Sequence, residues 1–383
     1  MNLEFLEYRP RKVVNAHRHV DGPWFWEKYS AHPYVGCRSG CEFCYLRGGR
    51  YLGRRDPATF DTLIQVKINS VELLRKELST LEPDVIACGD WQQPAEDRYR
   101  LSRQMLAVVL DLGFPLFIVE RSPLLVRDLD LLVEINNHSW VGVVFSLSNV
   151  DPLLKQIFEP RSPGLKRRFQ AMQTLAKAGI LVGTSLMPVI PKVGDDEKHL
   201  EAAVLATKDH GGSFVLAGGL TMEGVQAEHT LAAARRFSPS LEGHLRQLYR
   251  WSAGGKPAYS PPRAYNARLG LLVRELCSRH GLADRMPRHI PASTLNVNKR
   301  IAERLFLKTY DLELEQADEY RVWAYRKAAW TVDELPQSIA GIYQSRGAAG
   351  LQELPGIGHT LAQEISKWLQ DFSAEEVQFE TQN

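Results

Sequence analysis

Cysteine is scarce in this chain: five of the 383 residues are cysteines, and three of these lie close together. An odd, low and clustered set of cysteines argues against a disulfide framework and favours a metal site in a reducing compartment. Long apolar runs are also missing, since no segment approaches the roughly 18 consecutive apolar residues that suggest a membrane-spanning helix. The first residues lack a basic region followed by an apolar run, so we expect no signal peptide, no membrane contact and a cytoplasmic location.

A strong excess of either charge is missing as well. The 47 lysines and arginines nearly balance the 45 aspartates and glutamates, which leaves a formal net charge of +2. This is too little to indicate nucleic-acid binding, so such binding must be argued from local patches. Hydrophobic residues make up 44% and charged residues 24% of the chain, as in soluble globular proteins. The length predicts two or three domains, although an α/β barrel alone can exceed about 200 residues.

Three cysteines, Cys37, Cys41 and Cys44, fall within eight residues, and Tyr45 follows directly. Three thiolates this close together suit one multi-iron site better than three separate roles. A [4Fe–4S] cluster that is bound by three cysteines keeps one iron open, and an open iron can chelate a small ligand. The alternative is a zinc site, which would need a fourth ligand, and His32 is the nearest candidate.

From about residue 31 to residue 220, strand-like apolar runs alternate with segments of helical period. The expected strands are 63–68, 84–87, 115–119, 140–147, 181–187 and 213–217. The expected helices are 71–81, 99–112, 124–135, 165–178 and 196–210. This alternation predicts parallel βαβ units with a sheet that is buried on both faces. Gly113 and Gly179 stand where two of the helices should end, at the left-handed cap position that glycine favours.

Six such repeats predict an α/β fold with a partial (βα)6 barrel of the TIM type. In barrels of this kind the active site lies at the carboxyl ends of the strands. The polar segments expected at those ends are Gly89-Asp90, Glu120-Arg121-Ser122, Ser146-Leu147-Ser148-Asn149 and Pro188.

The expected domains follow from changes of pattern along the chain. An arm over residues 1–30 packs over the cluster-bearing domain, and the barrel covers residues 31–250. A loop or boundary closes this region before residue 263. Residues 263–310 are helical and strongly basic, and they form either a solvated surface or a patch that tracks phosphates. A last all-α block covers residues 311–372, and the acidic tail over residues 373–383 is frayed.

A turn in the last helical block, Leu354-Pro355-Gly356-Ile357-Gly358, separates two short helices. A turn of this composition exposes several backbone N–H groups at the N-terminus of the second helix. Such a cluster of amides is an anion site by geometry alone.

The cysteine triad on the strand–helix pattern resembles the radical S-adenosylmethionine superfamily. The run from about Pro33 to Pro191, roughly half of the chain, resembles the branch related to spore photoproduct lyase. The resembling segments are 33–37, 66–69, 98–103, 122–128, 145–148, 159–163 and 188–191.

This resemblance implies that Cys37, Cys41 and Cys44 bind three irons of a [4Fe–4S] cluster. The amino and carboxylate groups of S-adenosylmethionine would chelate the fourth iron. One electron from the reduced cluster, supplied by a donor such as flavodoxin or ferredoxin, would split S-adenosylmethionine into methionine and a 5′-deoxyadenosyl radical. The radical abstracts hydrogen from a substrate, while the protein orients and shields it.

The resemblance also implies contacts to S-adenosylmethionine. Tyr45 would pack near the adenine, and Gly89 with Asp90 would take the place of the Gly-Gly-Glu segment that contacts the methionine amino group. Ser146 and Ser148 would contact the ribose or the carboxylate, or else cap the turn that follows their strand.

Two further residues have both a functional and a structural interpretation. Cys88 is either a hydrogen donor to a product radical, a role known in spore photoproduct lyase, or a small buried core residue. Lys67 meets a substrate phosphate or the carboxylate of S-adenosylmethionine, or it forms a salt bridge across the barrel mouth.

The C-terminal block resembles the helix-hairpin-helix region of family X DNA polymerases. The segments that carry this resemblance are 324–329, 335–336 and 350–358. In that family the amides of the hairpin grip DNA phosphates without reading sequence. The resemblance implies that Gly356, Gly358, His359 and Thr360 face a phosphate, with Lys367 nearby. The alternative is a helical hairpin that serves protein contacts or packing.

Together the two resemblances imply a radical S-adenosylmethionine enzyme that repairs or modifies a base in DNA, such as a photoproduct lyase. The target nucleotide would then be extruded toward the barrel mouth. One rival keeps the radical chemistry but directs it to RNA or to a protein-bound group. The other rival is a nucleic-acid-binding protein whose cluster is structural or senses the redox state.

Overall fold

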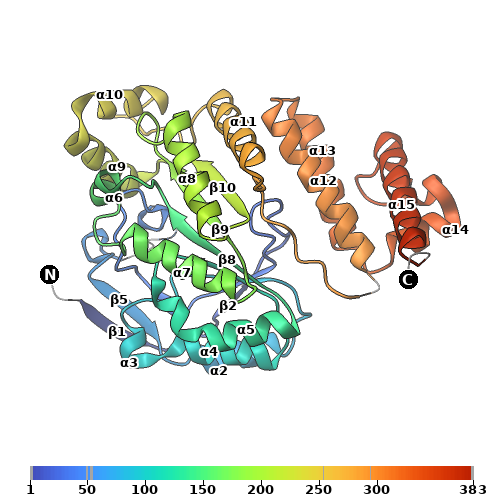
Figure 1. Ribbon diagram of the computed structural model, residues 1–383, viewed down its shortest axis with the longest axis horizontal. Coiled ribbons are helices and arrows are strands. Elements are labelled where there is room, and N and C mark those ends of the chain that lie inside the picture. Colours follow the sequence, from blue (N-terminus) through green and yellow to red (C-terminus); the bar gives the residue numbers. More distant parts are fainter. Residues whose placement is uncertain (1–2, 49–50, 52–54, 253, 294, 381–383) are drawn as a thin grey trace. The chain divides into compact units, whose positions relative to one another are not determined.

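The main sheet has seven strands in the computed structural model, which describes residues 3–48, 51, 55–252, 254–293 and 295–380 (Figure 1). The strands are β2 (Val14–Ala16), β3 (Tyr29–Ala31), β6 (Ile86–Gly89), β7 (Leu116–Glu120), β8 (Val141–Leu147), β9 (Leu181–Val189) and β10 (Phe214–Gly219). Their order is β10-β9-β8-β7-β6-β3-β2, and six successive strands from β10 to β3 run parallel. The predicted α/β fold with parallel strands is thereby confirmed.

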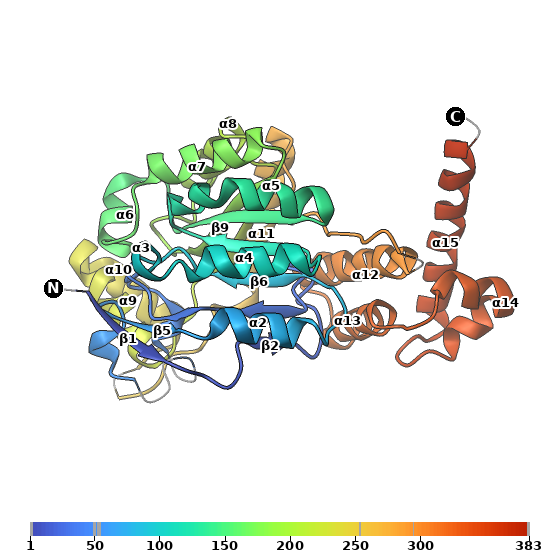
Figure 2. The ribbon, with the colours of Figure 1, turned by 90° about the horizontal axis from the view of Figure 1, so that it is seen from below.

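Helices cover the outer face of this sheet, and Figure 2 shows them following one another across it. They are α2 (Ser70–Leu78), α4 (Leu101–Asp111), α5 (Leu129–His138), α7 (Leu165–Lys177) and α8 (Glu197–Asp209), with α11 (Arg263–His280) packed against β10. Every residue of β8 is buried, as expected of a strand covered on both faces. Gly113 and Gly179 adopt φ values of +70° and +79°, which confirms their left-handed conformation after α4 and α7.

A second, three-stranded sheet contains the segment that was expected to open the barrel. Its order is β1 (Glu4–Tyr8), β5 (Leu63–Lys67), β4 (Tyr34–Val35). The place beside β6 is taken by β3, which has three residues and is too short to stand out as an apolar run. In β5, buried Ile64 and Val66 alternate with partly exposed neighbours, a pattern typical of a sheet covered on one face.

Short elements complete the barrel unit, and two of its helices were not expected. The short elements are η1 (Tyr45–Arg47), η2 (Pro57–Thr59), η3 (Pro123–Asp128), α3 (Glu96–Tyr99) and α6 (Pro152–Phe158). Helices α9 (Gly224–Phe237) and α10 (Pro239–Leu248) lie at the end of the expected barrel region, where no element was predicted. Ser238 begins α10, since its hydroxyl accepts a hydrogen bond from the amide of Leu241 and Pro239 follows it.

The chain divides into two units. The barrel unit comprises Met1–Arg18 and Glu27–Pro287, and the helical unit comprises His19–Trp26 and Arg288–Asn383. The helical unit contains α12 (Asn296–Leu314), α13 (Glu319–Asp333), α14 (Ile339–Gln352) and α15 (His359–Glu380). Gly347, with φ +60°, interrupts α14, so that a short helix precedes the hairpin turn. No helix in the described ranges is long and apolar enough to cross a membrane.

The N-terminal region differs from the single arm that was expected. Its strands β1, β2 and β3 pair within the barrel unit, whereas residues 19–26 belong to the helical unit. The indole of Trp26 is buried against Phe306, with 5.7 Å between ring centroids, and the Arg288 guanidinium lies 4.9 Å from the Trp26 ring. Burial of this aromatic surface explains why the segment packs with helices. The basic segment 263–310 is likewise divided, because α11 lies in the barrel unit and α12 in the helical unit.

Candidate active site and nucleic-acid interface

The three clustered cysteines lie on a loop that follows β4 and is shaped by two glycines with positive φ. Gly36 has φ +97°, and a Cβ placed on it would lie 2.7 Å from the carbonyl oxygen of Leu63. Gly40 has φ +54°, and a Cβ there would lie 2.4 Å from Nη2 of Arg161. A larger residue at either position would be strained and would collide. The backbone of the loop is therefore fixed by close neighbours on both sides.

All three thiols are held in one largely buried space. Burial is the main cause that raises the pKa of Cys37 well above its usual value, of Cys41 to about 12 and of Cys44 to about 11. Electrostatic repulsion from Cys41 and Cys44 contributes to the shift at Cys37, so the three sulfurs are neighbours. Thiolates in this space need a positively charged partner, and iron would supply it.

A mononuclear zinc site would need a fourth ligand beside the three cysteines. Among the described residues, no three Cys, His, Asp or Glu side chains converge as ligands of one metal ion. His32, the nearest candidate for a fourth ligand, hydrogen-bonds through Nδ1 to the carbonyl oxygen of Gly89 at 3.2 Å. In a four-iron cluster each cysteine binds a different iron, and no fourth protein ligand is needed, whereas a zinc site would need one.

Asp90 and Gln93 adjoin the first cysteine at the carboxyl end of β6. The thiol of Cys37 donates to Oδ1 of Asp90 at 3.4 Å, and Nε2 of Gln93 donates to the Cys37 sulfur at 3.5 Å. Asp90 has φ +55°, an unusual conformation for a residue other than glycine. The segment Gly89-Asp90 thus lies beside the cysteine loop, where the sequence placed a contact to S-adenosylmethionine.

A buried ion network lies beneath the loop, at the ends of β7 and β8. Glu159, which is fully buried, pairs with Arg168 at 2.7 Å and with Arg121 at 3.7 Å. Burial acts to raise the pKa of Glu159, but the guanidinium groups of Arg168 and Arg121 lower it to about 2. Although burial disfavours its charge, Cys41 and Glu159 raise the pKa of Arg121. Arg121 therefore stays cationic beside the sulfurs.

Ser146 and Ser148 lie at the end of β8, above the same network. The carbonyl oxygen of Ser146 accepts from Nη1 of Arg168 at 2.9 Å, and the amide of Ser148 donates to Oε1 of Glu159 at 2.7 Å. The Ser148 hydroxyl is buried and has no hydrogen-bond partner among the described residues. The next helix, α6, is capped by Asp151 instead. The Ser148 hydroxyl lies close enough to the Glu159 carboxylate to help lower its pKa, so both groups belong to the buried network.

The remaining predicted residues of the barrel unit take different places. Tyr45 is 54% exposed and packs edge-on against Tyr51, with 5.1 Å between ring centroids. Cys88 belongs to the hydrophobic core between the sheet and its helices, and burial and Glu120 raise its pKa well above the usual value. Successive residues of a strand point to opposite faces of the sheet, so the Cys88 side chain lies on the face opposite to that of Gly89. This position favours the structural interpretation of Cys88.

Lys67 is partly buried at the end of β5. Burial lowers its pKa to about 8, and the nearby Glu77 opposes this shift only partly. The carboxylate of Glu77 is itself engaged, since it accepts from the amides of Val13 and Val14. The nearest carboxylate is thus occupied by backbone amides, and the role of Lys67 stays a prediction.

Several residues that support the site were not found from the sequence. Arg168 resembles a surface residue because it follows Lys166 and Arg167, yet it falls on the apolar face of α7 with Phe169 and Met172. The position of the Arg168 charge on the apolar face of this helix was the signal in the sequence that Arg168 has a buried partner. Helix α9 also holds the loop: Gln226 Nε2 donates to the carbonyl oxygen of Phe43, and Arg236 pairs with Glu42 at 2.6 Å.

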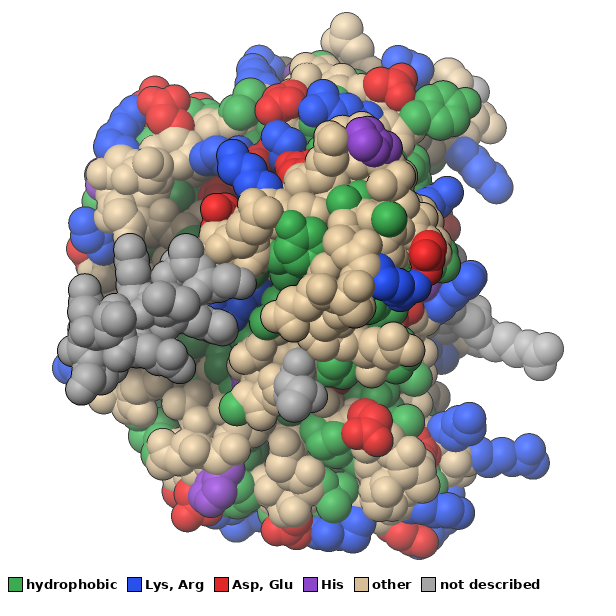
Figure 3. Space-filling view, turned by 90° about the vertical axis from the view of Figure 1, so that its right-hand side faces the viewer, with side chains coloured by type: hydrophobic (Ala, Val, Ile, Leu, Met, Phe, Trp, Pro, Cys, Tyr) green, Lys and Arg blue, Asp and Glu red, His purple; other side chains and the backbone are tan. Residues whose placement is uncertain are grey.

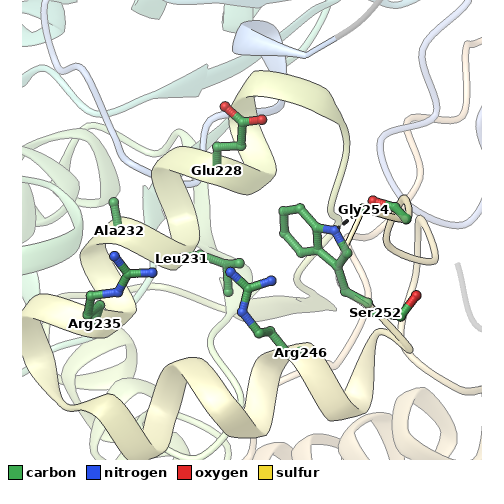
Figure 4. A pocket seen from close by; sticks show the side chains of 9 residues that line it. Glu228, Leu231, Ala232, Arg235, Arg246, Ser252 and Gly254 are labelled. Atoms are coloured by element: carbon green, nitrogen blue, oxygen red, sulfur yellow. Dashed lines mark hydrogen bonds between the residues drawn. The ribbon is translucent and has the colours of Figure 1, made fainter.

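A cavity of about 670 Å³ lies on the opposite face of α9, between α9 and α10 (Figure 4). Its two guanidinium groups, from Arg235 and Arg246, both pair with Glu242. The indole N–H of Trp251 donates to the carbonyl oxygen of Gly255 at 2.9 Å. These polar groups are already engaged, and the cavity is lined by none of the cysteines.

The hairpin turn of the helical unit exposes its amides. Gly356, with φ +76°, Gly358, His359 and Thr360 are all exposed, whereas Ile357 is buried and anchors the turn. Among the described residues, the amides of Gly356, Gly358 and His359 have no backbone acceptor outside the helices. A Cβ on Gly358 would meet nothing within 4 Å. The turn therefore offers an open anion site at the start of α15.

The cations of the basic segment are largely paired. Arg288 and Lys299 bind the buried carboxylate of Asp333, and Arg274 pairs with Asp284 at 3.0 Å. On the face shown in Figure 3, basic, acidic and apolar side chains are interspersed. These pairs favour a structural role for much of the segment over a continuous phosphate-tracking patch.

Comparison with known proteins gives two family matches. A profile of the radical SAM superfamily matches residues 32–203, and a profile of a helix-hairpin-helix domain matches residues 296–373. An uncharacterised protein of Mycobacterium tuberculosis is 30% identical over 262 residues, which cover 67% of this chain and 75% of that protein.

Two further matches carry descriptive names. The radical SAM Nα-GlyT isomerase of Pseudomonas phage M6 is 26% identical over 276 residues, covering 68% of this chain and 53% of that protein. Spore photoproduct lyase, solved in complex with a dinucleoside spore photoproduct, superimposes with a TM-score of 0.54 at 16% identity. That match covers 73% of this chain and 81% of the lyase, and it shows a shared fold.

Proposed function

Because this chain belongs to the radical SAM superfamily, we propose that it repairs or modifies a base in DNA. Members of the superfamily are enzymes whose cofactors are a [4Fe–4S] cluster and S-adenosylmethionine. The observation that carries the proposal is the buried cysteine loop at the carboxyl ends of the strands, in a chain that also holds an open amide turn. The first can hold the cofactors, and the second can hold a nucleic acid.

We assign Cys37, Cys41 and Cys44 as the ligands of the cluster. The chemistry that the cluster supplies when bound is one-electron cleavage of S-adenosylmethionine into methionine and a 5′-deoxyadenosyl radical. Asp90 lies beside Cys37 and gives a carboxylate that can accept hydrogen bonds from an ammonium group. Arg121 places a cation near the sulfurs, where it balances negative charge, and the buried Ser148 hydroxyl can hydrogen-bond a bound cofactor.

The choice of DNA rests on the helical unit. The exposed amides of residues 356–360 suit a phosphate group, and contacts of this kind bind nucleic acid without reading sequence. One structural neighbour is consistent with this choice, since its solved complex contains a dinucleoside spore photoproduct. Chemistry on a base at the barrel would require the nucleotide to leave the stack. A donor such as flavodoxin or ferredoxin would supply the electron.

We propose a reducing compartment, such as the cytoplasm, as the location of the protein. All five cysteines are free, and cluster thiolates must stay reduced to bind iron. Iron loading after aerobic and anaerobic preparation of the protein tests this requirement. Equal loading under both conditions would contradict it.

The test is anaerobic turnover by reconstituted, reduced protein. We expect cleavage of S-adenosylmethionine and transfer of deuterium between labelled DNA and 5′-deoxyadenosine, followed by mass spectrometry. Cys41→Ala should abolish both and lower iron content, whereas Cys277→Ala, at a core cysteine of α11, should retain them. Cleavage without deuterium transfer to or from any DNA, but with transfer from RNA, would reject DNA and assign the chemistry to RNA. Absence of cleavage by iron-loaded protein would support a non-enzymatic redox sensor.

A further inference from the structure

Two large hydrophobic side chains of the helical unit are exposed, and both stand on one face of α13. Tyr320 is 88% exposed and Trp323 is 45% exposed, and the other exposed large hydrophobic residues of the described chain lie in the barrel unit. Residues three, four and seven positions apart share a helix face, so Tyr320, Trp323 and Lys327 form one stripe. Lys327 is exposed as well. We name these three residues the α13 stripe.

The α13 stripe leads directly to the hairpin turn. A Cβ on Gly356 would lie 3.8 Å from the Cβ of Lys327, and Thr331 Oγ1 donates to the carbonyl oxygen of Pro355 at 2.9 Å. With a helical rise of ~1.5 Å per residue, Trp323 lies ~6 Å and Tyr320 ~10 Å from Lys327 along the axis. Aromatic rings thus continue outward from the open amides.

The ring of Trp323 is held in place by its neighbours. The Arg326 guanidinium lies 5.0 Å from the centre of the Trp323 ring, and Glu313 pairs with that guanidinium. Trp330, in contrast, has a structural role, because its indole N–H donates to the carbonyl oxygen of Val20 and its ring stacks on His19. The Trp323 and Tyr320 side chains, by contrast, are 45% and 88% exposed. A fixed, exposed aromatic ring beside a cation suits a flat apolar ligand.

We propose that the α13 stripe is a stacking platform for unpaired bases of a DNA strand whose phosphates bind Lys327 and the hairpin amides. This inference rests on the proposed function and adds single-stranded or locally opened DNA to it. Aromatic rings stack on any base, while the neighbouring cation and amides match the charge of the strand. Two acidic residues, Asp318 and Glu319, directly precede Tyr320. Asp318 caps α13 by accepting from the Tyr320 amide at 2.9 Å.

The test compares bases with phosphates on the same strand. Full-length protein is titrated with a labelled single-stranded oligonucleotide, with the same oligonucleotide carrying abasic sites, and with the duplex. We expect the wild type to bind the intact strand more tightly than the abasic strand. Stacking of this kind changes affinity by roughly fivefold to a hundredfold per base. The double variant Tyr320→Ala/Trp323→Ala should lose this preference but keep its affinity for the duplex.

Two controls separate the outcomes. Tyr259→Ala removes an exposed tyrosine of the barrel unit and should change nothing, whereas Trp323→Phe should retain part of the preference. If the double variant lost the same affinity for the intact and the abasic strand, base stacking would be overturned and contacts to the DNA backbone would be indicated. If the double variant still preferred the intact strand over the abasic strand, base stacking on the α13 stripe would be overturned, although the protein would still bind DNA. A change in molar mass of the double variant on sedimentation would identify the stripe as a contact between copies. Failure of the wild type to bind any DNA would instead reject the DNA part of the proposed function.

Discussion

The charged groups beneath the cysteine loop of the barrel unit are buried and paired with one another, whereas the residues of the hairpin turn in the helical unit are largely exposed. Glu159, Arg168 and Arg121 form a closed network beneath the cysteine loop. Gly356, Gly358 and His359 expose their amides without any such support. The first arrangement suits a small cofactor held in one orientation, and the second suits a long, flexible anion. The two regions should therefore respond differently to mutation.

The largest effect is expected from breaking the buried network of the barrel unit. Arg168→Ala leaves Glu159 buried without its closest partner, and loss of one partner of a buried pair costs about 3–5 kcal/mol. Urea unfolding of the variant should show this loss in the free energy of unfolding. Arg167→Ala, at the exposed neighbouring position, should change that energy by less than about 0.5 kcal/mol. If both variants lowered the free energy of unfolding equally, the stabilising role of the buried network would be contradicted.

The helical unit holds a buried charge group around Asp333, and this group gives a pH prediction. Burial alone would raise the pKa of Asp333, but Arg288 and Lys299 lower it below the usual value. A carboxylate with a depressed folded pKa stabilises the fold above its unfolded pKa, and this stability is lost as pH falls through the folded pKa. Asp333→Asn should lower the free energy of unfolding by about 3 kcal/mol at neutral pH and flatten its acid dependence.

The matched control for this prediction is Asp371→Asn. Asp371 pairs with Arg304 at 3.9 Å on the surface, and its side chain is 51% exposed. Surface pairs contribute about 0–1 kcal/mol, so the control should retain the acid dependence of the wild type. A steep acid dependence that survives in Asp333→Asn would assign the effect to other carboxylates.

A smaller effect is expected at the hairpin, where binding rather than stability should change. His359 is the first residue of α15, and proline is tolerated at a first helical position although it removes the amide donor. His359→Pro should weaken DNA binding by about tenfold, since a hydrogen bond to a charged group contributes about 1.5–3 kcal/mol. Fluorescence anisotropy measures the affinity. His359→Ala keeps the amide and should bind like the wild type, and an equal loss there would implicate the side chain instead.

The smallest effect is expected at Lys67, the partly buried cation of β5. Its pKa of about 8 lies below the usual value because burial disfavours the charge. The unfolded chain then binds more protons than the folded chain between about pH 8 and pH 10, so stability should rise across this window. The gain is at most about 1 kcal/mol per pH unit. Lys67→Met should abolish the rise in urea unfolding, and a rise that persists would exclude Lys67 as its source.

Periodicity and spacing determined the broad plan of the molecule. The spacing of Cys37, Cys41 and Cys44 predicted a shared site because neighbours in the chain are necessarily close in space. Gly113 and Gly179 were identified as helix caps because their conformational freedom is local. The Pro355-Gly356 turn was recognisable for the same reason. Five of the six expected barrel strands pair in the main sheet, since an apolar run buried on both faces is a strong signal.

Tertiary structure alone decided which elements meet. Residues 63–67 entered a second sheet because one of their faces stays uncovered, and the short β3 took the place beside β6. Arg168 became a partner of Glu159 through the packing of α7, and Cys88 was turned into the core by the alternation of β6. Pairing and burial depend on residues distant in the chain, which no local pattern records. The sequence alone determined which reactive side chains this protein has. The packing of distant segments decided which of these side chains lie next to one another.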